Sequence, residues 1–338
     1  MKQKVGNLIK LVLSLGFGIF LFWLFLGKMP PEEKQQTLNT IKNAKWGWLL
    51  LIPVLGFFSN FNRSERWRYL LQSVGYQPRF WNTFFSVMVM YFANLFIPRF
   101  GEVLRCTILN KCEDIPVDKA IGTMLLERIL DLVAVLIIAG VLFLVEGDKL
   151  LKMWEQKNAS AEAANTPWII QYIIPIILVL GVSAASFYIW KKFGFKKFMD
   201  IVKGRFMGVW EGLRSIRNVK QPVMFTLHTL SMWLCYWGMS YFAFRALPET
   251  AHLSVWAGMA CLVFGGFAMV AAPGGIGTFF VAIALVLTQY DIDLNIGKAF
   301  GLSVWAMQTL AALTGGIVSF IVLALMNRDL LSTVKTTK

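Results

Sequence analysis

Long apolar runs separated by short polar segments dominate the chain. The hydrocarbon core of a bilayer is about 30 Å thick and takes about 20 helical residues to cross. The runs that we expect to cross it are 11–26, 46–61, 117–145, 168–190, 222–244 and 297–326. The pattern therefore predicts an all-α polytopic membrane protein with six full transmembrane helices.

Two further apolar stretches are interrupted near their middle. The first covers 80–97, breaks at Pro98 and resumes over 102–110. The second covers 253–272, breaks at a proline and three glycines, and resumes over 278–290. Irregular backbone at membrane depth is tolerated only where it is buried in protein or lines a wet cavity. We therefore expect two re-entrant helical hairpins in addition to the six spans.

Positive charge sets the orientation of the chain. Lysine and arginine gather in 63–79 and 191–220, whereas the loop 146–166 is balanced by acidic residues. Cytoplasmic loops carry the excess of positive charge, so the two basic segments are predicted to be cytoplasmic and 146–166 external. These assignments agree if the first hairpin opens inward and the second outward. The expected location is the inner (cytoplasmic) cell membrane, with both termini in the cytoplasm.

The two halves of the chain repeat one order of elements. We interpret 1–338 as a single membrane domain made of a first repeat, 1–145, and a second repeat, 168–326. Each reads as span, interfacial helix, span, broken hairpin and long span, the interfacial helices being 31–45 and 191–220. The hairpins point in opposite directions, as in inverted-repeat transporters, where broken helices meet near the midplane and form the substrate site.

Composition narrows the functional classes. The chain is 57% hydrophobic and 15% charged, with a mean hydropathy of +0.60, which excludes a soluble domain of useful size. The net charge of +14 is confined to loops, which argues against nucleic acid and favours contact with anionic lipid headgroups. The four cysteines lack the spacing of metal ligands. There is no nucleotide-binding motif, so we do not expect the chain to hydrolyse ATP. We expect no cofactor and no metal.

The two breaks differ in chemistry. The first reads Asn94-x-x-x-Pro98-Arg99-x-Gly101-Glu102-x-x-Arg105 and carries charge into an apolar region. The second reads Pro273-Gly274-Gly275-Ile276-Gly277 and carries no reactive side chain. Its glycines allow a tight turn and expose backbone amides that can meet an anion, or they simply let the tip pack closely.

A third polar cluster lies in the long apolar run of the first half. Glu127, Arg128 and Asp131 fall about ten residues into this helix, roughly 15 Å along it. Ionisable residues inside a membrane face a cavity or the bundle interior and are functional candidates. We take them, with the polar residues of the first break, as the candidate substrate-binding set. The alternative is a buried ion-pair network that fastens the hairpin to the helix without a ligand. In that network Arg99, Arg105 and Arg128 would balance Glu102, Glu127 and Asp131.

Together these three motifs resemble the signature of the lysylphosphatidylglycerol synthase transmembrane family, also called flippase-like integral membrane proteins. The resemblance covers about residues 8 to 326. We expect the chain to differ from bifunctional members in lacking their aminoacyl-transferase domain. It also has Phe280 where many relatives carry an acidic residue, so we expect no acidic partner from the second hairpin.

The resemblance implies transbilayer movement of an anionic or aminoacylated lipid. The arginines of the set, Arg99, Arg105 and Arg128, would then meet the headgroup phosphate, because the planar guanidinium matches an oxyanion. The carboxylates would hold those arginines in place or relay a proton.

Two other functions remain open. One is a membrane-embedded lipid-modifying enzyme with Glu127 or Asp131 as general base, although the chain has no HExxH or GxSxG motif. The other is a scaffold that recruits a biosynthetic partner through 191–220. The glycine pairs at 265–266 and 315–316 could pack helices within the chain or between copies, which leaves a homo-oligomer open.

Overall fold

The computed structural model describes residues 31–97, 99–163, 214–271, 275 and 277–327. All regular elements in this part of the chain are helices, which confirms the predicted all-α class. The expected spans 11–26 and 168–190, and most of the basic segment 191–220, lie outside the described residues.

The helices fall into two series along the chain. In the first half they are α2 (Pro31–Lys42), α3 (Trp46–Leu49), α4 (Leu51–Ser73), α5 (Phe80–Asn94), α6 (Phe100–Glu113) and α7 (Val117–Ala163). In the second half they are η1 (Ser215–Asn218), α10 (Pro222–Ala243), η2 (Phe244–Ala246), α11 (Val255–Ala271), α12 (Thr278–Thr288) and α13 (Leu294–Met326). Helix α7 bends at Glu146, whose backbone is not helical (φ −126°, ψ 27°).

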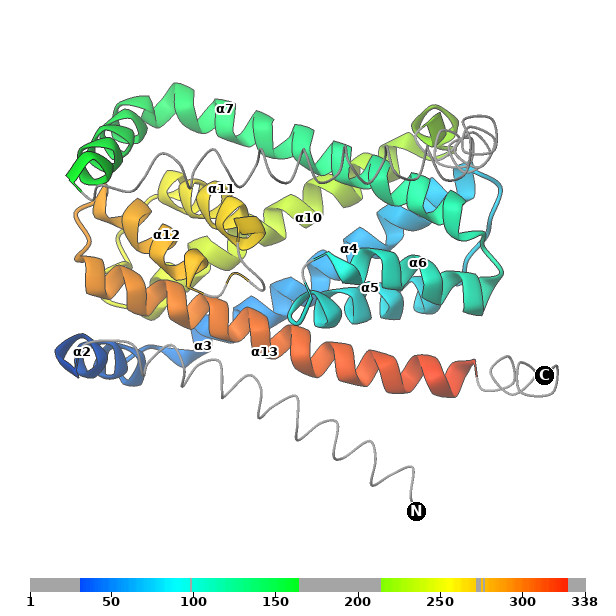
Figure 1. Ribbon diagram of the computed structural model, residues 1–338, viewed down its shortest axis with the longest axis horizontal. Helices are drawn as coiled ribbons and strands as arrows, with labels where there is room; N and C mark the ends of the chain where they lie inside the picture. Colours follow the sequence, from blue (N-terminus) through cyan, green and yellow to red (C-terminus); the bar gives the residue numbers. More distant parts are fainter. Residues whose placement is uncertain (1–30, 98, 164–213, 272–274, 276, 328–338) are drawn as a thin grey trace, which may run out of the picture.

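The two long helices, α7 and α13, run along opposite edges of the molecule, as Figure 1 shows. Between them α4 packs against α10, with α5 and α6 toward one end and α11 and α12 toward the other. Each broken helix pair contacts the long helix of its own half, α6 on α7 and α12 on α13. Each also contacts the long helix of the other half, because α5 packs on α13 and α11 on α7. The two pairs thus have equivalent surroundings.

Two of the described helical segments are long and apolar enough to cross a membrane, by length and composition. They are Val117–Gly147, within α7, and Leu294–Met326. Shorter apolar segments at Phe80–Phe96, Val255–Met269 and Thr278–Thr288 coincide with arms of the expected hairpins. The helix–break–helix pairs are therefore present. The count of six crossings and the re-entrant course of the pairs stay predictions.

The prediction that 63–79 forms a loop is wrong over the first part of this segment. Helix α4 continues through Arg63 and Arg66 to Ser73, and the chain turns only near Gly75, where φ is +96°. No glycine or proline lies between Phe57 and Val74, so nothing in the sequence stops the helix. Arg63 and Arg66 are only 4% and 0% exposed. Their charge faces other helices instead of water.

Small residues let helices approach closely within the chain. Gly315 and Gly316 of α13 face α5, and a Cβ on Gly316 would lie 2.3 Å from the Cβ of Phe92. Gly265 of α11 faces α12, where an added Cβ would lie 2.9 Å from Phe279. These glycines therefore serve packing inside one molecule.

Candidate functional site

The polar residues at the first break shape the α5–α6 turn. The Oδ1 atom of Asn94 accepts a hydrogen bond of 2.8 Å from the backbone N–H of Gly101, and its Nδ2 donates to Glu102 Oε2 at 3.5 Å. A Cβ on Gly101 would lie 2.1 Å from the carbonyl oxygen of Met90, so only glycine fits between the two helices. Asn94 thus satisfies one of the free amides at the start of α6. Pro98 lies outside the described residues.

Arg99 immediately precedes α6 and has a left-handed backbone, with φ +62°. Its side chain is exposed. Within the described ranges its guanidinium makes no hydrogen bond or ion pair. The structure therefore separates Arg99 from the other arginines of the predicted set.

Five charged side chains meet inside the helix bundle and form what we call the buried arginine–carboxylate cluster. They are Arg63 and Arg66 of α4, Arg105 of α6, and Glu127 and Asp131 of α7. Glu127 is fully buried and pairs with Arg66 at 3.2 Å, with Arg105 at 2.9 Å and with Arg63. Asp131 pairs with Arg66 at 2.6 Å and with Arg63 at 3.1 Å. The cluster thus joins three helices by charge.

Helical spacing explains why these side chains can meet. Glu127 and Asp131 are four residues apart on α7, and Arg63 and Arg66 are three apart on α4, so each pair shares one helix face. All four lie well inside their helices. Where α4 and α7 approach, two acidic positions therefore face two basic ones.

A second ionic contact lies at the edge of the buried cluster, and we call it the rim pair. Arg128, which is 36% exposed, contacts Glu102 Oε1 at 3.4 Å. It also reaches Asp131 Oδ2 at 3.4 Å. The rim pair links α6 to α7 beside the first break and is the more accessible part of the ionic system.

Several guanidinium donors in the buried cluster have no acceptor among the described residues. They are Nε and Nη1 of Arg66 and Nε and Nη1 of Arg105. The Arg105 guanidinium lies 4.1 Å above the Trp67 ring, which gives it an aromatic face but no hydrogen-bond acceptor. A buried donor without an acceptor costs about 1–3 kcal/mol, more when charged. These four nitrogens can therefore still donate to a further acceptor.

Hydroxyl groups from two further helices complete the surroundings of Arg63. The oxygen of Tyr236, on α10, accepts from Arg63 Nε at 3.3 Å and from Nη2 at 3.2 Å. Tyr91 of α5 lies 3.1 Å from the same oxygen. The second half of the chain thus contributes a neutral hydroxyl to a cluster whose charges come from the first half.

Two glycines shape the described part of the second break. Gly275 and Gly277 have φ values of +67° and +82°, which side-chain-bearing residues rarely adopt. A Cβ on Gly275 would also lie 2.2 Å from Met269 Sδ. Pro273 and Gly274 lie outside the described residues. Phe280 is buried against Gly301 of α13, and α11 and α12 contain no charged residue, so this pair adds no ion to the cluster.

Polar contacts connect helices at the two ends of the molecule. At one end the side-chain amides of Asn82 and Asn327 exchange hydrogen bonds of 3.3 and 3.1 Å, and Glu113 accepts from Asn82 and Arg79. At the other end Tyr290 donates to Glu146, where α7 bends. Since α13 separates them, these contacts lie roughly 50 Å apart at ~1.5 Å per residue.

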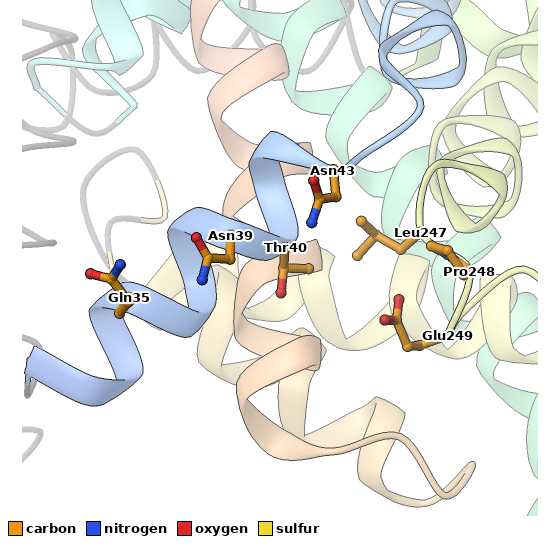
Figure 2. A pocket seen from close by; sticks show the side chains of 7 residues that line it. All are labelled: Gln35, Asn39, Thr40, Asn43, Leu247, Pro248 and Glu249. Atoms are coloured by element: carbon orange, nitrogen blue, oxygen red, sulfur yellow. The ribbon is translucent and has the colours of Figure 1, made fainter.

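A separate groove of about 640 Å³ lies between α2 and the turn after η2. Figure 2 shows its lining residues, which are Gln35, Asn39, Thr40, Asn43, Leu247, Pro248 and Glu249. No lysine or arginine lines it, and it contains none of the predicted site residues. This groove is therefore not the site that the motifs predict.

In the described ranges, no group of three or more His, Cys, Asp or Glu side chains is arranged so that it could hold a metal ion. The four cysteines are free, and Cys106 and Cys261 are buried.

The structure brings together most of the predicted ionic residues and adds four that the motifs did not include. The predicted residues that meet are Glu102, Arg105, Glu127, Arg128 and Asp131. The added residues are Arg63, Arg66, Tyr91 and Tyr236. The helical spacing of Arg63 and Arg66, directly after an apolar run and without a helix breaker, is the signal that would have found them.

Comparisons with known proteins place the chain. The family described as "Lysylphosphatidylglycerol synthase TM region" matches residues 7–326. A UPF0104 membrane protein of Methanocaldococcus jannaschii is 29% identical over 126 residues, which cover 36% of this chain and 38% of that protein. No solved structure matches the chain. Since the family match covers nearly its whole length, the chain belongs to the lysylphosphatidylglycerol synthase transmembrane-region family of membrane proteins.

Proposed function

We propose that this protein moves a phospholipid with an anionic or aminoacylated headgroup from one leaflet to the other. The observation that carries the proposal is the buried arginine–carboxylate cluster, held inside a helix bundle whose two long helices, α7 and α13, contain apolar segments long enough to cross a membrane. A headgroup can cross hydrocarbon only if the protein supplies countercharges and hydrogen bonds along its path. The acyl chains can stay in lipid during the same movement.

The arginines divide into two groups in this proposal. Arg63, Arg66 and Arg105 bind the headgroup phosphate inside the bundle, and Glu127 and Asp131 hold them in place when no lipid is bound. Arg99 and Arg128, which are accessible, meet the headgroup first. This assignment extends the set expected from the motifs by two buried arginines and gives Arg99 an entry role.

In this proposal, the movement that transports the lipid comes from two halves related as an inverted repeat. Each broken pair contacts the long helix of the opposite half, as expected if 1–145 and 168–326 form an inverted repeat. The Asn82–Asn327 contact and the Glu146–Tyr290 contact close opposite ends of the molecule. Opening one while the other stays closed would expose the cluster to one side at a time.

The enzyme alternative is less well supported. A general base needs a carboxylate oxygen free to accept a proton from the substrate. Both oxygens of Glu127 already contact arginines, and so do both oxygens of Asp131. The scaffold alternative requires no such cluster.

Headgroup translocation in proteoliposomes tests the proposal. The full chain should transfer fluorescent phosphatidylglycerol between leaflets without changing its mass, and Arg105→Gln and Glu127→Gln should lower the rate at least about tenfold, equivalent to ~1.4 kcal/mol. Glu249→Gln, outside the cluster, makes the same charge change as Glu127→Gln and is its control. If Arg105→Gln and Glu127→Gln both transfer lipid at the rate of the parent chain and of this control, the cluster is not the path. A change in the mass of the lipid would favour an enzyme.

A further inference from the structure

We infer that the buried cluster takes one singly charged oxyanion, a phosphodiester, and discriminates against the doubly charged phosphomonoester. The inference deepens the proposed function by fixing the charge of the group that the site accepts, and it rests on that function for the lipid as source of the oxyanion.

The charge count of the cluster carries the inference. Three guanidinium groups, those of Arg63, Arg66 and Arg105, face two carboxylates, those of Glu127 and Asp131. Among the described residues, one positive charge is therefore left without a counterion. The rim pair of Glu102 and Arg128 is neutral, so the excess is the same whether or not the rim is included.

Unused donors mark where the missing charge belongs. Arg66 and Arg105 are both fully buried, and each has two guanidinium nitrogens without an acceptor in the described structure. Burying a charged group is costly unless it is paired and hydrogen-bonded. An oxyanion supplies the charge and the acceptors together, and its oxygens match the guanidinium fork.

Beyond the neutral rim pair, the described side chains that contact the cluster are uncharged, and this limits the charge of the ligand. Trp67 lies beneath Arg105 and donates its ring N–H to Thr123, while Tyr91 and Tyr236 supply only neutral hydroxyls. A phosphodiester brings one negative charge and leaves the cluster neutral. A phosphomonoester in its dianionic form would leave a net negative charge in the same buried place, where charge interactions are strong.

Lipid binding, measured apart from transport, tests the inference. The purified full chain is titrated at pH 8 with phosphatidylglycerol, a phosphodiester, and with phosphatidic acid, a phosphomonoester, and complexes are counted by native mass spectrometry. We expect phosphatidylglycerol to bind at least about tenfold more tightly. Asp131→Asn adds one net positive charge and should shift the ratio toward phosphatidic acid by about tenfold. Arg105→Gln removes the excess and should weaken phosphatidylglycerol binding by at least that factor.

Control variants and soluble competitors separate the possible outcomes. Glu249→Gln makes the same charge change outside the cluster and should leave the binding ratio unchanged. Dimethyl phosphate, a free phosphodiester, should compete with phosphatidylglycerol better than inorganic phosphate does, and the reverse order would overturn the inference. Two other results would also overturn the inference. One is equal binding of both lipids by the parent chain, and the other is an Asp131→Asn variant whose ratio of the two affinities equals that of the parent chain. If Asp131→Asn does not fold, Glu102→Gln at the more exposed rim makes the same charge change.

Binding and transport fail separately in this design. A chain that prefers the phosphodiester but does not move lipid between leaflets contradicts the proposed function and leaves this inference standing. A chain that moves lipid with no preference between the two phosphate classes contradicts only the inference.

Discussion

The two broken helix pairs share one architecture and differ in chemistry. The α5–α6 pair places Asn94, Glu102 and Arg105 at or near its break, and it contacts α7 through two ion pairs, Glu102 with Arg128 and Arg105 with Glu127. The α11–α12 pair turns on Gly275 and Gly277 and packs Phe280 against α13. Equivalent positions in the fold thus serve ionic contact in one half and close packing in the other.

The two halves of the chain also contribute differently to the buried cluster. All charges of the buried cluster come from α4, α6 and α7, and the second half adds a single hydroxyl through Tyr236. If the site binds lipid, the first half supplies the binding chemistry and the second half supplies a surface that can move against it. Changes in the first half should therefore have larger effects than changes in the second.

The largest effect is expected from Glu127→Ala, which removes the carboxylate shared by three arginines. Breaking a buried ion pair from one side leaves uncompensated charge, so we expect a loss of about 3–5 kcal/mol in the free energy of unfolding. Denaturant titration in micelles followed by tryptophan fluorescence measures it. A loss below about 1 kcal/mol would show that the cluster does not hold the first half together.

Next comes Gly101→Ala, compared with Gly266→Ala. The added methyl at Gly101 meets the Met90 carbonyl oxygen, so we expect a loss of about 1–3 kcal/mol from overpacking. Gly266 is helical with open space around it, and alanine there should be neutral or stabilising by up to about 1 kcal/mol. The same unfolding titration compares them, and equal losses would contradict the tight α5–α6 contact.

An effect of similar size is expected from Tyr236→Phe, which removes the second half's hydroxyl from Arg63. The loss of two hydrogen bonds to a charged donor should cost about 1.5–3 kcal/mol, less if water enters the space. Combining it with Arg63→Gln in a double-mutant cycle isolates the contact. Additive losses would show that the two halves are not coupled through this hydroxyl.

The smallest effect is expected from Tyr290→Phe at the end of the α11–α12 pair. It removes one hydrogen bond to Glu146, so the stability loss should be about 1 kcal/mol. If this contact closes one end of a transport path, the variant should change the leaflet-transfer rate by more than its small loss of stability explains. A transfer rate equal to the parent's would remove this contact from the mechanism.

Much of the architecture could be predicted from local pattern. Apolar runs predicted an all-α membrane protein, and the breaks at Pro98 and at 273–277 separated the arms of the two helix pairs. The spacing of Glu127 and Asp131 placed two carboxylates on one face of a long apolar helix. Helix type and helix face depend on neighbours within a few residues, and for that reason the sequence determines them directly. The predicted length of α4 is wrong, because the charges of Arg63 and Arg66 are typical of a loop.

The composition of the cluster was decided only by the tertiary structure. Arg63 and Arg66 have the sequence appearance of a cytoplasmic basic loop, because hydropathy counts each charge as if it faced water. Their actual environment depends on Glu127 and Asp131, over 60 positions away, and on Tyr236, 173 positions from Arg63. Arg99 belongs to the motif yet stays exposed at the start of α6, where its backbone is left-handed. Whether a charge meets water or a partner is fixed by packing between distant helices, which no local pattern contains.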